Sequence, residues 1–162
     1  MSEQEEKYLH FVSCIDDLNN AWRLLQEIKK CGGNSLVDVA FQFALIQYSK
    51  SYKCAYGSVL NSKGKPTSYK LDESHIPINY AELHSRIISA RDQIHAHSDL
   101  TVREAKLYIS DTSDGKIVTK IQNKICETEE LSNIDSLIDL IEHSLDSMYK
   151  KAKQLESDLP IT

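Results

Sequence analysis

The feature that most constrains the fold of this chain is an apolar pattern near its C-terminus, in which steps of three and four residues alternate. Its members are Leu131, Ile134, Ile138, Ile141, Leu145, Met148, Ala152 and Leu155. This spacing keeps the side chains on one face of an α-helix, and it is typical of helices that pack antiparallel in a bundle. The pattern predicts a helix over about residues 128–157, with its Met and Leu positions in the core.

A second amphipathic helix is predicted at the N-terminus. Ser2 and Glu5 have the spacing of a capping box, in which each residue satisfies a backbone N–H group of the other. Apolar side chains then recur at helical spacing: Tyr8, Phe11, Ile15, Leu18, Trp22, Leu25 and Ile28. Gly32 and Gly33 supply a stop signal, so this helix is expected over about residues 4–30.

Residues 36–46 are apolar on almost all sides, which is typical of a helix contacted by several neighbours. Val39, Phe41 and Phe43 also alternate as in a strand, but the length of the apolar run favours a helix. We therefore expect a central helix over residues 35–60, followed by a loop over residues 61–78, where glycine and proline are frequent.

A third helix is expected over about residues 79–97, because apolar side chains again follow helical steps there. Alternating residues on both sides of the turn Asp111–Gly115 predict a β-hairpin at about residues 104–123. An isolated two-stranded hairpin is only marginally stable in water, so we expect this one to pack on the helices.

Together these elements predict an all-α fold, a four-helix up-and-down bundle with a β-hairpin inserted before the last helix. The 162 residues would form a single domain, and their 41% hydrophobic and 27% charged composition is that of an ordinary globular protein. No apolar run approaches the roughly 18 residues of a membrane span, and the N-terminus is acidic and polar rather than signal-like. We expect a cytoplasmic location.

Several catalytic classes leave no motif in the sequence. Glycine-rich phosphate loops, the G-x-S-x-G nucleophile elbow and the H-E-x-x-H zinc motif are all missing. The cysteines at positions 14, 31, 54 and 126 form no C-x-x-C pair, and Cys14 fits the apolar face of the first helix. We therefore expect neither a metal ion nor any other cofactor.

The charge is unevenly distributed along the chain. The net charge of −5 argues against a general attraction to nucleic acid. Residues 49–71, however, contain five lysines and no acid, so Lys50 and Lys53 are candidate contacts to an anionic substrate. The alternative is an ordinary lysine-rich surface loop in water.

The residues best suited to chemistry lie between positions 91 and 99. Histidine can move a proton near neutral pH, and arginine presents a charged fork that fits phosphate. Arg91, Asp92 and His97 could therefore support RNA cleavage in which the ribose 2′-hydroxyl attacks the neighbouring phosphate. The alternative is that Arg91 and the two histidines, His95 and His97, only favour the negative C-terminal end of a helix.

Arg91-Asp92-Gln-Ile-His-Ala-His97 resembles the signature of HEPN domains: arginine, a polar residue, four variable residues and histidine. The continuation Ser98-Asp99 resembles the motif of an abortive-infection subgroup. The resemblance implies an all-α domain that forms a homodimer, so that two copies of the motif share one cleft. It also implies that Arg91 holds phosphate, that His97 is an acid or base and that Asp92 orients them. His95, inside the variable stretch, is a candidate substrate contact.

Two functions stay open at this point. The first is a metal-independent endoribonuclease with RNA as its substrate, in phage defence or in a toxin–antitoxin pair with a cognate antitoxin protein. The second is a catalytically silent helical module that binds a protein or nucleotide partner. The direction in which Arg91 and His97 face is expected to discriminate between them.

Overall fold

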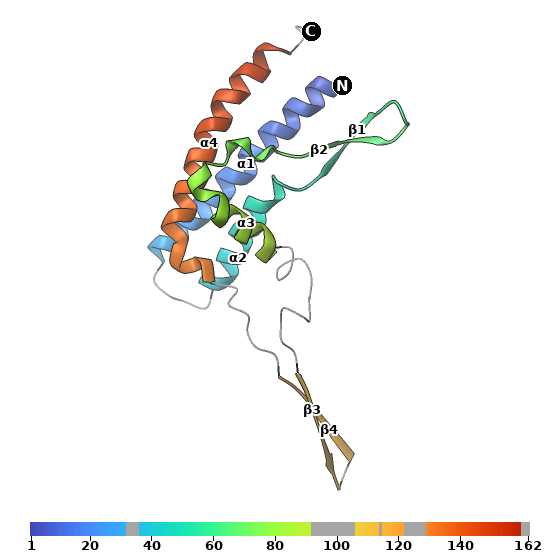
Figure 1. Ribbon diagram of the computed structural model, residues 1–162, viewed down its shortest axis with the longest axis vertical. Helices are drawn as coiled ribbons and strands as arrows, with labels where there is room; N and C mark the ends of the chain where they lie inside the picture. Colours follow the sequence, from blue (N-terminus) through green and yellow to red (C-terminus); the bar gives the residue numbers. More distant parts are fainter. Residues whose placement is uncertain (32–35, 92–105, 114, 122–128, 160–162) are drawn as a thin grey trace.

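The structure, a computed structural model, describes residues 1–31, 36–91, 106–113, 115–121 and 129–159 (Figure 1). The helices are α1 (Glu3–Lys30), α2 (Val37–Lys50), α3 (Ala81–Ala90) and α4 (Ile134–Ser157). The strands are β1 (Ala55–Leu60), β2 (Pro66–Tyr69), β3 (Lys106–Thr112) and β4 (Gly115–Ile121). Short 3-10 turns occur at η1 (Glu73–His75), η2 (Ile78–Tyr80) and η4 (Glu129–Asn133).

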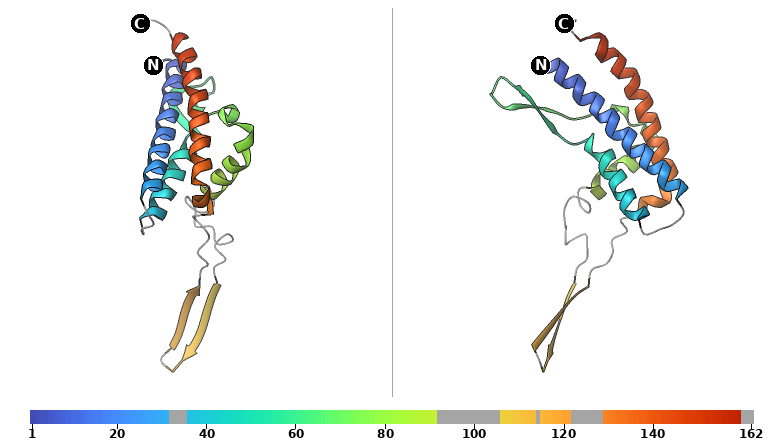
Figure 2. Two further views of the ribbon diagram at one scale, coloured as in Figure 1. Left: turned by 90° about the vertical axis from the view of Figure 1, so that its left-hand side faces the viewer. Right: turned by 180° about the vertical axis from the view of Figure 1, so that it is seen from behind.

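Helix α1 begins as the sequence predicts. The Glu5 N–H donates to Ser2 Oγ at 3.2 Å, and the Ser2 N–H donates to the Glu5 carboxylate at 2.6 Å, which completes the capping box. Cys14, Leu18 and Leu25 of this helix are buried. Helix α1 lies beside both α2 and α4 (Figure 2). The central helix of the fold is therefore α1, and not the helix predicted over residues 35–60.

Helix α4 buries the central members of the predicted apolar pattern over a wider face than the spacing indicated, whereas Leu131, Ile134, Ala152 and Leu155 are half-buried. Its buried side chains are Leu137, Ile138, Leu140, Ile141, Ser144, Leu145 and Met148. Leu137 and Leu140 lie outside the predicted pattern, and both are fully buried. The wider face follows from the position of α4, which contacts α1 along its length and also packs against η1.

The all-α prediction is wrong, because the chain contains a second hairpin. Helix α2 ends at Lys50 rather than near residue 60, and β1 and β2 then pair as antiparallel strands. At the tip of this hairpin the Asn61 side chain accepts hydrogen bonds from the Lys63 and Lys65 N–H groups, at 2.9 and 3.2 Å. Gly64 adopts a φ of 69°, a left-handed conformation that glycine tolerates. The fold is therefore mostly helical with two separate hairpins.

The carboxylate of Glu6, on α1, fixes the first hairpin in place. It accepts hydrogen bonds from the Ser58 N–H and hydroxyl groups, at 2.5 and 2.6 Å, and from the Tyr69 hydroxyl at 2.9 Å. A Cβ atom at Gly57 would collide with this carboxylate, so the close approach needs glycine. These contacts join residues more than fifty positions apart, and local patterns in the sequence do not reveal them.

These hydrogen bonds lower the pKa of Glu6 to about 2, with the bond from the Ser58 side chain as the largest cause. The unfolded chain protonates this group near 4.5, so its contribution to stability is complete above that pH. The contribution is lost as the pH falls from 4.5 towards 2. Glu6→Gln is expected to lower the melting temperature at pH 7 and to make the acid-induced decrease between these pH values shallower. Melting curves by circular dichroism from pH 7 to pH 2 measure both effects.

Glu3→Gln is the matched control, because Glu3 lies on the same helix, one turn earlier, and is exposed. This control should retain the wild-type profile. Equal effects from the two variants would show that net charge, rather than the hairpin contacts, governs the acid response.

Helix α2 is not surrounded by neighbours, in contrast to the sequence-based prediction. Phe41, Ala44, Leu45 and Tyr48 are buried, but Leu36, Val39 and Phe43 are exposed along the opposite face. Apolar residues on all sides of this helix therefore do not indicate burial on all sides, because α2 has one buried and one exposed face.

The β3–β4 hairpin occurs where the sequence predicts it, with residues paired from Lys106 and Ile121 to Thr112 and Gly115. The expectation that it packs on the helices is wrong for the part of the hairpin whose side chains are described. Leu107 and Ile109 are 67% and 63% exposed, and the hairpin stands apart from the helices (Figures 1 and 2).

Helix α3 starts after η2, and Arg91 is the last residue described before residue 106, so the predicted extension to residue 97 lies outside the described residues. None of the helices in the described ranges combines the length and apolar character that crossing a membrane requires.

Candidate functional site

Arg91 closes helix α3. Its backbone N–H group donates to the carbonyl oxygens of Ile87 and Ile88, which continues the helical pattern through this residue. The Arg91 side chain is half-buried, and its Nε atom is fully buried. Asp92, His95 and His97 lie outside the described residues. The structure therefore places the first residue of the predicted motif at the C-terminal end of α3.

His84 lies two turns before Arg91, on the same face of α3, since seven residues complete almost two turns. The His84 side chain is buried. The Tyr48 hydroxyl and His84 Nδ1 form a hydrogen bond of 2.7 Å, and the rings of Tyr52 and His84 meet edge to face at 4.6 Å. This cluster joins α3 to α2 and fixes the direction in which the end of α3 points.

Burial lowers the pKa of His84, so the imidazole is neutral at pH 7. The hydrogen bond to Tyr48 and the edge-to-face contact with Tyr52 hold the His84 ring at the junction of α2 and α3. His84 therefore positions the helix that carries Arg91.

The structure does not leave the predicted substrate contact Lys50 open. Its ammonium pairs with the Asp17 carboxylate on α1 at 2.6 Å and donates to Gln47 at 3.2 Å. Lys53 follows in the turn after α2 and is half-buried. The Lys50–Asp17 pair is partly shielded from solvent, because the two side chains are 47% and 22% exposed.

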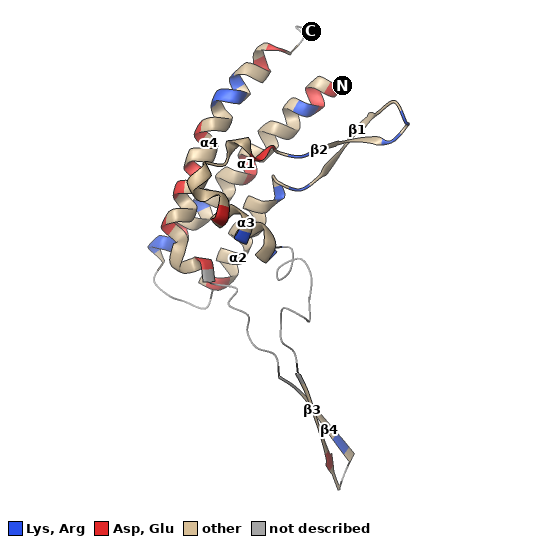
Figure 3. Ribbon diagram, viewed as in Figure 1, with Lys and Arg blue, Asp and Glu red and all other residues tan. Residues whose placement is uncertain are grey.

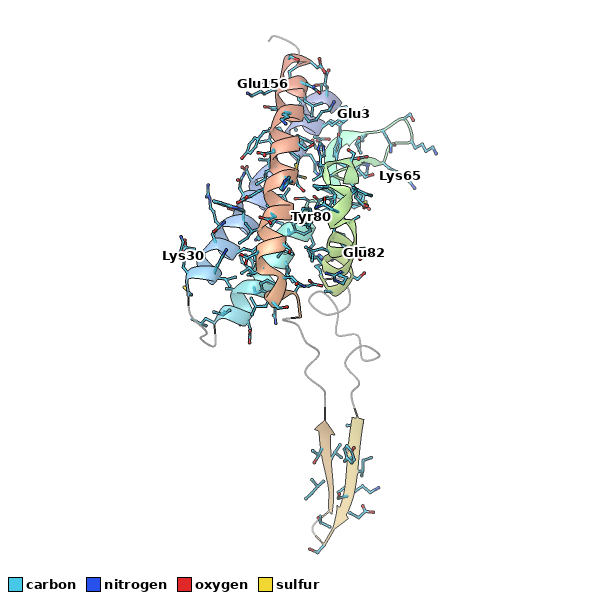
Figure 4. All side chains as sticks on the ribbon, turned by 60° about the vertical axis from the view of Figure 1, so that its left-hand side comes forward. Glu3, Lys30, Lys65, Tyr80, Glu82 and Glu156 are labelled. Atoms are coloured by element: carbon cyan, nitrogen blue, oxygen red, sulfur yellow. The ribbon has the colours of Figure 1, made fainter. Side chains whose placement is uncertain are left out.

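Other lysines of the basic stretch lie along the first hairpin. Lys65 stands at its tip (Figure 4), and Lys63 is exposed beside it. Figure 3 shows basic and acidic residues interspersed over α1 and α4. The exposed positions of Lys63 and Lys65 agree with a solvated loop at the tip of the hairpin.

Sequence reasoning missed a second group of polar residues, which lines a groove of about 710 Å³. Lys7, His10 and Phe11 line it from α1, and Tyr69 and Lys70 line it from the end of β2 and the residue that follows. His75 and Lys151 complete it from η1 and α4. The three segments are distant in sequence, so no local motif marks this α1–α4 groove.

In the described part of the chain, no three His, Cys, Asp or Glu side chains converge into a group that could hold a metal ion. Comparison with known proteins gives no match: no family model, no curated protein and no solved structure resembles the chain. The residues themselves therefore carry the functional argument.

Proposed function

We propose that the chain is a metal-independent endoribonuclease of the HEPN type, which acts as a homodimer in phage defence or in a toxin–antitoxin pair. The observation that carries the proposal is the run from Arg91 to His97, with arginine, aspartate and histidine at the spacing of the HEPN signature. The position of Arg91 at the end of α3 supports it, because the arginine then continues from a helix fixed to the core.

The reaction in this proposal needs no group beyond the protein and the RNA. A base removes the proton of the ribose 2′-hydroxyl, and the 2′-oxygen attacks the neighbouring phosphorus. The bond to the 5′-oxygen breaks, and an acid protonates that oxygen as it leaves. His97 serves as base or acid, and the second motif copy of a dimer offers a second histidine. Arg91 stabilises the added charge on the phosphate.

The burial of Arg91 Nε favours the second function, a silent binding module. A guanidinium whose Nε is enclosed by protein presents only its terminal nitrogens to a ligand. Two terminal N–H groups are still enough to hold one phosphate. The two functions therefore differ in whether His97 transfers a proton, and that difference is measurable.

The test is incubation of the purified protein with mixed cellular RNA in the presence of EDTA. We expect cleavage to persist in EDTA, and light scattering at micromolar concentration to give twice the mass of the 18.4 kDa chain. Absence of cleavage under all conditions would favour the silent module. Cleavage that EDTA abolishes would contradict the metal-independent mechanism, and a monomeric mass would contradict the shared cleft.

A further inference from the structure

The α1–α4 groove lies where three segments meet, and Arg91 is not among the described residues that line it. Figure 1 shows α1 and α4 side by side, and the segment from β2 through η1 contacts both helices. Its volume of about 710 Å³ is within the usual range for small-molecule sites. A ligand of moderate size would therefore fit without a change in the fold.

One wall of the groove is built from aromatic rings. The rings of His10 and Tyr69 are stacked at 5.6 Å with an interplanar angle of 30°, and Phe11 meets His75 at 5.7 Å. The hydrogen bond from the Tyr69 hydroxyl to Glu6 holds the first pair in place. Flat ring faces on a fixed support suit contact with a planar aromatic ligand.

Burial lowers the pKa of both histidines, so neither ring is charged at pH 7. The Nδ1 atom of His75 is 2.9 Å from Ser147 Oγ, which orients that ring. Neutral, oriented imidazoles add hydrogen-bonding groups to the aromatic wall without adding charge.

Three lysines give the groove its positive charge. The Lys7 ammonium makes no hydrogen bond or ion pair with any residue that the structure describes. Lys151 contacts the neutral amide of Gln154 at 3.4 Å, and Lys70 makes a solvent-exposed pair with Glu73 at 3.3 Å. Such exposed contacts are weak, so all three ammonium groups are available to an anion.

The acids of the groove offset this charge only in part. Glu3 and Asp72 also line it, and the Asp72 carboxylate accepts the Ser74 N–H at 2.6 Å. With three lysines against these two carboxylates, the lining keeps a formal charge of +1 in a protein whose overall charge is −5. An aromatic wall beside lysines has the features that a phosphate attached to a planar base requires.

We propose that the α1–α4 groove binds a nucleoside phosphate, with the base against the Tyr69–His10 pair and the phosphate among Lys7, Lys70 and Lys151. The inference does not depend on RNA cleavage, because it uses none of the residues assigned to that reaction. The same chemistry occurs in a free mononucleotide and at the 5′-phosphorylated end of an RNA, so the two sources need separate measurements.

The experiment is isothermal titration of the full chain with the four ribonucleoside 5′-monophosphates, each in turn. The comparison ligands are the matching nucleosides, inorganic phosphate and a short oligoribonucleotide with and without a 5′-phosphate. We expect saturable binding of at least one monophosphate, about tenfold or more tighter than that of its nucleoside or of phosphate alone. A 5′-phosphorylated oligonucleotide that binds more tightly than every mononucleotide would identify an RNA end as the source.

The decisive variant is the double substitution Lys7→Gln with Lys151→Gln, which is expected to weaken binding about tenfold or more. The matched control is Lys30→Gln with Lys153→Gln, which removes the same charge from the same two helices outside the groove. Since all four lysines are exposed, both variants should fold.

Three results would overturn the assignment: equal weakening in the two double variants, no saturation up to about 5 mM of any monophosphate, or equal affinity for phosphate alone. The His97→Ala protein should bind the nucleotide as the wild type does. Failure of cleavage and failure of binding can therefore be distinguished.

Discussion

RNA cleavage is expected to fall by about 10²–10⁴-fold when His97 is replaced by alanine, because the imidazole would no longer transfer a proton in the reaction. Arg91→Lys should also lower the rate, since a single ammonium cannot reproduce the two parallel hydrogen bonds of a guanidinium to phosphate. Cleavage of a labelled RNA in EDTA, at equal protein concentration, measures the loss. Circular dichroism verifies that each variant is folded.

His143→Ala is the matched control for this experiment. His143 is an exposed histidine on α4, and its Nδ1 atom contacts the Asp139 carbonyl oxygen of the same helix at 2.7 Å. Its replacement removes a surface imidazole outside the motif and should leave the rate unchanged. A wild-type rate for His97→Ala, or an equal loss for both variants, would contradict the assigned role of His97.

The largest expected effect on stability is that of Phe41→Ala. The Phe41 side chain is 0% exposed, so its truncation leaves a cavity between α2 and the rest of the core. Loss of a fully buried phenylalanine typically costs about 3–5 kcal/mol, and we expect the free energy of unfolding to fall by that amount. Urea denaturation followed by circular dichroism measures the change.

Phe43→Ala supplies the comparison, because Phe43 is 50% exposed on the same helix. Its truncation is expected to cost less than about 1 kcal/mol. The pair also tests the conformation of this segment. Residues two apart lie about 200° apart around a helix but on the same face of a strand. Similar losses for the two variants would therefore favour a strand.

The long helices could be predicted because their information is local. Ser2 and Glu5 specify the start of α1, and the regular apolar steps of α4 specify its buried face. The β3–β4 hairpin is local in the same sense, since its turn and both strands lie within sixteen residues.

The first hairpin could not be predicted in this way, because its position depends on contacts across the fold. The apolar stretch 36–46 is followed by a more polar one, and no glycine or proline before Gly57 marks the end of α2 at Lys50. The segment after α2 is distinguished by its contact with α1, where the Glu6 carboxylate accepts hydrogen bonds from the Ser58 and Val59 N–H groups. The sequence around Glu6 does not show that its carboxylate is buried against residues 52 positions away.

The candidate sites divide in a similar way. Arg91 could be found from the sequence, because its motif is a short contiguous run. The burial of His84 could not, since it depends on Tyr48 of another helix. The α1–α4 groove draws on three distant segments, and Lys7 and Lys151 reveal their proximity only in the folded chain.

The burial of Cys14 has a practical consequence for following the motions of this fold. Desolvation raises the pKa of its thiol to about 11, and Sγ lies 3.8 Å from the Ser51 carbonyl oxygen. Cys31 and Cys54 are exposed, so a thiol reagent modifies them in the native state. Cys14 reacts only when α1 separates from the end of α2. The rate at which Cys14 is labelled therefore reports how often the contact between α1 and the end of α2 opens.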